Sequence, residues 1–75
     1  MPAREPVLKK FGGNVRGKRE ARNLSQESLA EQADLDRTYI GGIERGERNP
    51  TILSALRIAK ALKTSVAELC EGIDR

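Results

Sequence analysis

The sequence lacks histidine entirely and contains a single cysteine among its 75 residues. One cysteine cannot form an internal disulfide, and without histidine a zinc site has almost no ligands to use. We therefore expect no metal and no cofactor. A chain this short lies near the lower limit for independent folding, where a single core rarely supplies more than about 3–5 kcal/mol. Because the usual supports of a small domain are missing, we expect oligomerisation to supply the rest.

Long hydrophobic runs are missing too. No apolar run approaches the roughly 20 residues that span a bilayer, and no segment resembles a signal peptide. This pattern predicts a cytoplasmic protein without membrane contact. The sequence also has no pattern of an activated nucleophile, so we do not expect an enzyme. The net charge of +3 and the pI near 9.4 favour a polyanionic partner only slightly, since many basic proteins bind no nucleic acid.

What the chain does contain is helical periodicity, with no alternating strand pattern. This periodicity predicts a compact, all-α domain of five helices over residues 6–71, with residues 1–5 as a flexible N-terminus and 72–75 as a C-terminal tail. The first helix is expected over about 6–22 and the second over 26–33. The third begins after residue 36 and stops before the Asn49-Pro50 pair, because a residue before proline avoids the helical region.

The expected helix starts carry recognisable capping residues. Pro6 suits the first turn of the first helix, and Ser65 with Glu68 forms a capping box that opens the last one. Three further N-caps are expected at Ser25, Asp36 and Thr51. The fourth helix carries a broad apolar stripe, which consists of Ile52, Leu53, Leu56, Ala59 and Leu62.

Two adjacent glycines lie inside the third expected helix, where each costs roughly 0.5–1 kcal/mol relative to alanine. At about 100° per residue, Ile40 and Ile43 face the core. Thr38, Gly42 and Arg45 then point outward, and Gly41 lies on the flank. This outer face carries no acid. We interpret the missing side chains as clearance that lets the helix approach a large partner closely.

Glu44 lies on the inward side of the same helix. A buried carboxylate needs a charged partner that also forms hydrogen bonds with it. Arg19 is the best candidate, because it follows Val15 by one turn on the inward face of the first helix. A catalytic role for Glu44 would need a base, nucleophile or metal, and the chain supplies no convincing one. We therefore expect a structural Arg19–Glu44 ion pair.

Two short helices joined by a tight turn, the second with a polar outer face, describe a helix-turn-helix. From Phe11 to Leu69 the sequence resembles the Xre or phage-repressor class in its five-helix, lambda-repressor-like form. The segments that carry this resemblance are 24-LSQESLA-30, 40-IGGIERGERNP-50 and 56-LRIAKALKTSVAEL-69. The stretch 34-DLDRTYIGGIERGERN-49 is also similar to the recognition region of controller proteins from restriction–modification systems.

The resemblance implies roles for individual residues. Gln26, at the start of the second helix, would contact a DNA phosphate. The recognition helix would read base edges through Arg37, Thr38 and Tyr39, with Gly41 and Gly42 against the groove. The residues that would meet the DNA backbone or a groove edge are Arg45, Arg48 and Asn49. Many relatives have a long polar residue at the position of Gly42, and controller proteins often have serine at that of Gly41.

A monomer of this size would contact one half-site, and the family solution is a homodimer on a palindromic operator. Surplus apolar residues near the C-terminal end predict its interface, namely Ile52, Leu53, Val66 and Leu69. The partners that we expect are therefore double-stranded operator DNA and a second copy of the chain, with RNA polymerase as a further candidate. Cys70 is expected to be a packing residue and not a redox switch.

These observations predict a sequence-specific DNA-binding transcriptional regulator of the controller type. Two alternatives belong to the same class, a prophage-type repressor and an autoregulating antitoxin, although an antitoxin would need a toxin-binding segment. A different class, a helical module that binds protein and not DNA, would not require an acid-free outer face on the third helix.

Overall fold

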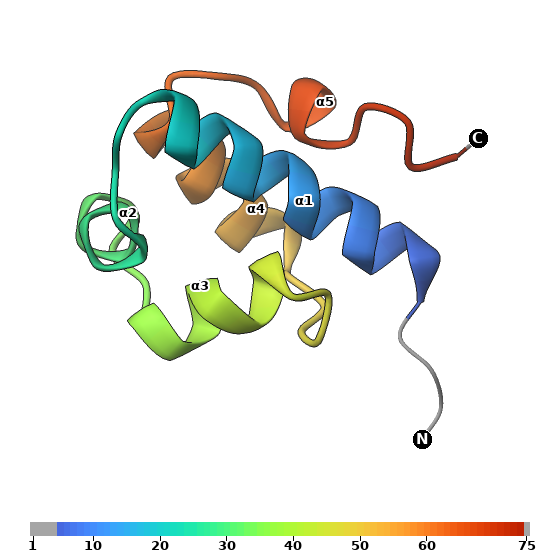
Figure 1. Cartoon of the computed structure of the whole chain (residues 1–75), viewed down its shortest axis with the longest axis horizontal. Helices are drawn as coiled ribbons and strands as arrows, with labels where there is room; N and C mark the ends of the chain where they lie inside the picture. The colour runs from blue at the N-terminus through green and yellow to red at the C-terminus, as the bar shows by residue number, and fades with distance from the viewer. Residues whose placement is uncertain (1–4, 75) are drawn as a thin grey trace.

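The computed structural model describes residues 5–74 and shows five helices packed around one core (Figure 1). The prediction of a flexible N-terminus at 1–5 lies outside these residues except for Glu5, which is the residue before the first helix. The predicted all-α class with five helices is confirmed. The helices are α1 (Pro6–Ala21), α2 (Gln26–Ala33), α3 (Arg37–Glu44), α4 (Ile52–Ala61) and α5 (Val66–Leu69).

Helices α2 to α5 each begin where a side chain satisfies one of the first backbone amides, whereas α1 begins with Pro6 and has no such cap. Ser25, Asp36, Thr51 and Ser65 each accept a hydrogen bond from a first-turn amide, at 2.7–3.0 Å, so the predicted N-caps are confirmed. The capping box at α5 is only half formed. The Glu68 carboxylate instead accepts from the Thr64 hydroxyl and the Lys18 ammonium, which attaches α5 to α1.

The third helix ends earlier than predicted, because its stop signal is Gly46 and not the Asn49-Pro50 pair. Gly46 has φ +77°, a left-handed conformation that residues other than glycine rarely adopt. The backbone then closes on itself, with the Glu47 amide donating to the Gly42 carbonyl at 2.8 Å. This closure satisfies the last carbonyls of α3 and turns the chain toward α4.

Helix α3 packs against α1 and α2, while α4 packs against α2 and α5. Figure 1 shows α5 on one side of α1 and α3 on the other. Asn14 ties α1 to the C-terminal segment by donating to the carbonyls of Leu69 (2.8 Å) and Glu71 (2.9 Å). Ile73 also packs against the core, so part of the predicted C-terminal tail belongs to the folded domain.

The apolar stripe of α4 is divided between the core, which takes Ala59 and Leu62, and the surface. Ile52, Leu53 and Leu56 are 84%, 56% and 43% exposed, so most of the predicted stripe points to solvent. Apolar residues lie nearly all round α4, and hydrophobicity alone could therefore not select the inward face. The buried apolar side chains of the domain are Phe11, Val15, Leu29, Ala30, Ala33, Ile40, Ile43, Ala55, Ile58, Ala59, Leu62 and Leu69.

Gly12 sets the distance between α1 and α3. A Cβ atom at this position would lie 2.1 Å from the Ile43 carbonyl oxygen and 2.7 Å from that of Glu44, well inside van der Waals contact. The two backbones can cross this closely only because the side chain is missing. Gly13 and Gly17 differ, since a Cβ atom on either would have no neighbour within 4 Å. Of these three glycines of α1, Gly12 alone is required by packing against another element.

Candidate nucleic-acid interface

The turn between α2 and α3 exposes the first turn of α3. Asp34 has the left-handed conformation that ends α2, and the Leu35 amide donates back to the Ala30 carbonyl at 2.9 Å. Asp36 then caps α3 by accepting from the Thr38 amide at 2.7 Å. Arg37 and Thr38 are exposed as a result, at the start of the helix that the resemblance assigns to base recognition.

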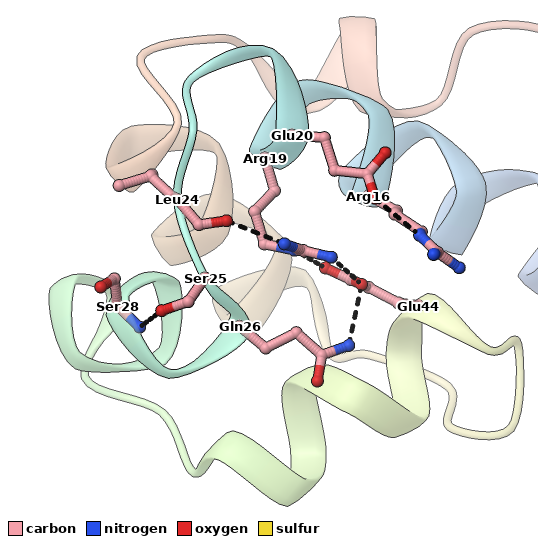
Figure 2. A network of polar contacts seen from close by, with 8 residues as sticks. All are labelled: Arg16, Arg19, Glu20, Leu24, Ser25, Gln26, Ser28 and Glu44. Atoms are coloured by element: carbon pink, nitrogen blue, oxygen red, sulfur yellow. Dashed lines mark hydrogen bonds and ion pairs between the residues drawn. The ribbon is translucent and has the colours of Figure 1, made fainter.

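Beneath α3 lies the ion pair of Arg19 and Glu44. The guanidinium contacts both carboxylate oxygens, with Nε to Oε2 at 2.7 Å and Nη2 to Oε1 at 3.1 Å, while Nη1 donates to the Leu24 carbonyl at 2.8 Å (Figure 2). The side chains are 11% and 2% exposed. The hydrogen bond with Glu44 raises the pKa of Arg19 above its ordinary value. This bidentate pair joins α1, the α1–α2 connection and the end of α3.

Gln26 is part of the same network, which the sequence did not indicate. Its Nε2 donates to Glu44 Oε1 at 3.0 Å, and Figure 2 shows its side chain directed at that carboxylate. A carboxylate only accepts hydrogen bonds, so the amide nitrogen must face Glu44. The second hydrogen of this nitrogen is the one that a phosphate could use. Glu44 therefore determines how Gln26 is presented at the start of α2.

Gly41 and Gly42 are buried, which corrects the prediction of a bare outer face. The protein's own arginines cover them. A Cβ atom on Gly42 would lie 2.5 Å from Arg48 Cγ, and one on Gly41 would lie 3.1 Å from Arg45 Nη1 and 3.5 Å from Gln26 Oε1. The direction of Gly42 follows the helical angle, but the segment after α3 folds back over it. A partner would meet arginine side chains there and not helix backbone.

Tyr39 is half-buried and connects α3 to α4. Its hydroxyl donates to Ser54 Oγ at 3.3 Å, and the same oxygen accepts from the Thr51 hydroxyl at 3.0 Å. The guanidinium carbon of Arg48 lies 5.1 Å from the centre of the Tyr39 ring, within cation–π range. Ser54 is buried, and the sequence did not predict its role. A hydroxyl residue at an inward position of α4 was the one feature that could have indicated it.

The remaining predicted residues are exposed around this cluster. Arg45 forms a partly exposed ion pair with Glu47, with Nε to Oε1 at 3.1 Å. Arg48 and Asn49 are exposed in the connection that follows α3. The structure therefore brings the side chains of Gln26 and Arg45 to the Gly41 position, and those of Tyr39 and Arg48 to one side of α3. It leaves Arg37 and Thr38 exposed at the start of the helix.

The predicted dimer residues are not equivalent. Leu69 is fully buried in the core, so it has no surface to offer a partner and that prediction is wrong. Val66 is half-buried against the same core. Ile52 and Leu53 are exposed, and together with Leu56 they form an apolar surface on α4, which we call the α4 patch. Cys70 lies beside Val66 in a shallow groove next to this patch.

The described residues show neither a candidate metal cluster nor a membrane-spanning helix. Within residues 5–74, no cluster of three or more histidine, cysteine or acidic side chains could hold a metal ion. No helix in the same range has the length and apolar character to cross a bilayer. The arrangement offers arginine, hydroxyl and amide groups on one side of α3, chemistry suited to phosphates and base edges.

Comparisons with known proteins agree with this geometry. A family model for the helix-turn-helix HTH_3 matches residues 15–69. The chain is 57% identical over 56 residues to the control protein C.SmaI of Serratia marcescens, which covers 75% of this chain and 67% of that protein. The crystal structure of the restriction–modification controller protein C.AhdI from Aeromonas hydrophila matches with a TM-score of 0.81 and 48% identity, over 83% and 94% of the two chains.

A further match is a complex with DNA. The restriction–modification controller protein C.Esp1396I, solved as a tetramer on its natural 35 base-pair operator, has a TM-score of 0.79 and 40% identity. The match covers 91% of this chain and 90% of that one.

Proposed function

Since the chain belongs to the helix-turn-helix family HTH_3, we propose that it is a sequence-specific DNA-binding transcriptional regulator of the restriction–modification controller type. The observation that carries this proposal is that α3 is held at both ends: its exposed first turn is capped by Asp36, and its last residue, Glu44, is paired with Arg19 of α1. A recognition helix requires this combination, because its first residues must reach base edges while its backbone stays fixed.

The residues at the interface divide into two kinds of contact. We expect Arg37 to pair with a guanine, and Thr38 and Tyr39 to touch a thymine methyl or a phosphate. Gln26 donates its second amide hydrogen to a phosphate at the start of α2, where the helix dipole also favours an anion. The segment after α3 supplies further contacts to the backbone or a groove edge through Arg45, Arg48 and Asn49.

We assign dimerisation to the α4 patch. Ile52, Leu53 and Leu56 are exposed large apolar side chains on a single helix, a feature typical of a surface that another protein covers. In a twofold dimer the same patch faces itself, and the two recognition helices enter successive major grooves about 34 Å apart. A contact with RNA polymerase would be needed for activation, and it stays a prediction.

The proposal is tested by comparing Arg37→Ala with the parent on operator and on random duplex DNA at two salt concentrations. A lost arginine–guanine pair should weaken operator binding by about 1–3 kcal/mol and relax the preference at one base pair. Lys18→Ala is the charge-matched control, because Lys18 contacts α5 on the side of α1 away from α3. Equal losses for Arg37→Ala on both duplexes would reassign Arg37 to a phosphate. A parent that binds both duplexes equally would refute sequence-specific function.

A further inference from the structure

The missing side chain at Gly42 makes room for Arg48 of the same chain. The position that a Cβ atom on Gly42 would occupy lies 2.5 Å from Arg48 Cγ, 3.4 Å from Cδ and 3.6 Å from Cβ. All three atoms belong to the aliphatic stem of one arginine, which therefore lies directly across α3 at this point. A side chain on residue 42 would have to displace the stem, whereas glycine leaves room for it.

The far end of the same arginine is held by Tyr39. Residue 39 precedes residue 42 by three positions, so the two lie one above the other on a helix. The guanidinium carbon of Arg48 lies 5.1 Å from the centre of the Tyr39 ring. The ring is itself fixed by the hydrogen bond from its hydroxyl to Ser54 Oγ at 3.3 Å. The stem thus rests on Gly42 and the charged head on Tyr39.

We propose that Gly42 is a positioning residue for Arg48: it provides the space in which this arginine lies along α3, preordered for DNA. The proposal rests on the function proposed above, and it replaces the interpretation that the helix backbone itself docks in the groove. A long, flexible arginine that is already held loses less freedom on binding than one that must be ordered by the DNA. Gly42 acts on affinity through Arg48 and does not itself contact DNA.

Gly41 shows why the effect is expected at Gly42 in particular. A Cβ atom on Gly41 would lie 3.1 Å from Arg45 Nη1 and 3.5 Å from Gln26 Oε1. These are the terminal atoms of flexible side chains, which can move aside by a few tenths of an ångström. The neighbour of Gly42 is the middle of a stem whose head is also held, so a methyl group there must release Arg48 from the ring.

The first test needs no DNA. Tyr39 is the only tyrosine in the sequence, so its ring protons give a single assignable set of NMR signals. Gly42→Ala and Arg48→Ala should shift these signals in the same direction and by similar amounts, because both remove the guanidinium from the ring. Gly13→Ala is the matched control, since a Cβ atom there has no neighbour within 4 Å. Tyr39 signals that stay unchanged in Gly42→Ala would refute the proposal.

The second test is a double-mutant cycle on operator binding. Gly42→Ala should weaken binding by about 2- to 12-fold, the effect of having to order one long side chain. In an Arg48→Ala background the same change should have no further effect. An equal loss in both backgrounds would overturn the proposal and restore the clearance interpretation. A Gly42→Ala variant that binds as tightly as the parent would overturn both.

Thermal melts accompany both tests, to show that each variant is folded at the assay temperature. Arg48 is exposed and can swing into solvent, so Gly42→Ala is expected to fold. The outcomes of this cycle are separate from the failure of the proposed function. A parent that fails to distinguish operator from random duplex would refute the function, whereas a specific parent with additive variants refutes only the role of Gly42.

Discussion

The substitution Gly12→Ala should destabilise the domain, whereas Gly13→Ala, the same change at the next residue, should stabilise it. The Cβ atom of Gly12→Ala would lie 2.1 Å from the Ile43 carbonyl oxygen and 2.9 Å from the Glu44 carbonyl carbon. These neighbours are backbone atoms in the last turn of α3, and they cannot rotate away as a side chain could. The two helices must therefore move apart at their crossing.

The magnitude follows from two opposing effects. Overpacking of a core costs about 1–3 kcal/mol, and a backbone neighbour at this distance places Gly12→Ala at the upper end, near 3 kcal/mol. Replacing glycine by alanine inside a helix returns about 1 kcal/mol. The net loss is then about 2 kcal/mol, which lowers the melting temperature of a domain of this size by roughly 8–16 °C.

The control is Gly13→Ala, which makes the same chemical change at the next residue of α1. No atom lies within 4 Å of its Cβ position, so only the helix-propensity gain applies. This variant should gain about 0.5–1 kcal/mol and melt a few degrees above the parent. Both are measured by circular dichroism at one protein concentration, because the proposed dimerisation would make the melting temperature concentration-dependent. A Gly12→Ala variant as stable as Gly13→Ala would refute the close crossing of α1 and α3.

Two further predictions concern the ion pair and the α4 patch. Glu44→Ala should lower the free energy of unfolding by about 3–5 kcal/mol, since it leaves the mostly buried Arg19 charged and unpaired. Replacing both Arg19 and Glu44 by apolar residues of similar volume should recover much of this loss. An unchanged urea midpoint for Glu44→Ala would show that the pair does not stabilise the fold. Ile52→Asp should shift the protein from dimer to monomer in sedimentation and weaken operator binding. Gln32→Asp is the control, because it introduces the same side chain at another exposed position. An Ile52→Asp variant that stays dimeric would show that Ile52 is not part of the interface.

Most of the helical framework could be predicted because its signals are local. The caps at Ser25, Asp36 and Thr51 depend on side chains that bond within three residues of themselves, so the sequence contains both partners. The Arg19–Glu44 pair is a longer contact, but it followed from a helical angle and one rule about buried charge. The caps need only local chemistry, and the ion pair needs only the periodicity of two helices together with that rule.

What could not be predicted depends on how separate segments meet. Gly42 points outward as its angle requires, yet only the three-dimensional path after Gly46 shows that Arg48 lies over it. The sequence likewise shows Gly12, Gly13 and Gly17 as three similar weaknesses, while the crossing with α3 requires only the first. Ile52 and Leu69 were grouped as interface residues because both are large and apolar. The packing of α5 against α1 and α4 buries Leu69 and leaves Ile52 exposed.

The bonds from Asn14 to the carbonyls of Leu69 and Glu71 also bear on how the chain acquires its fold during synthesis. They join residues near opposite ends of the described chain, and Leu69 fills the core beside them. Helix α3 is complete at Glu44, about 25 residues before Leu69 is added. At translation rates of about 5–20 residues per second, the ribosome needs roughly 1–5 s for that interval. During it α3 has been synthesised but Leu69 has not, so we expect a nascent chain to close its core only after α5 has been added.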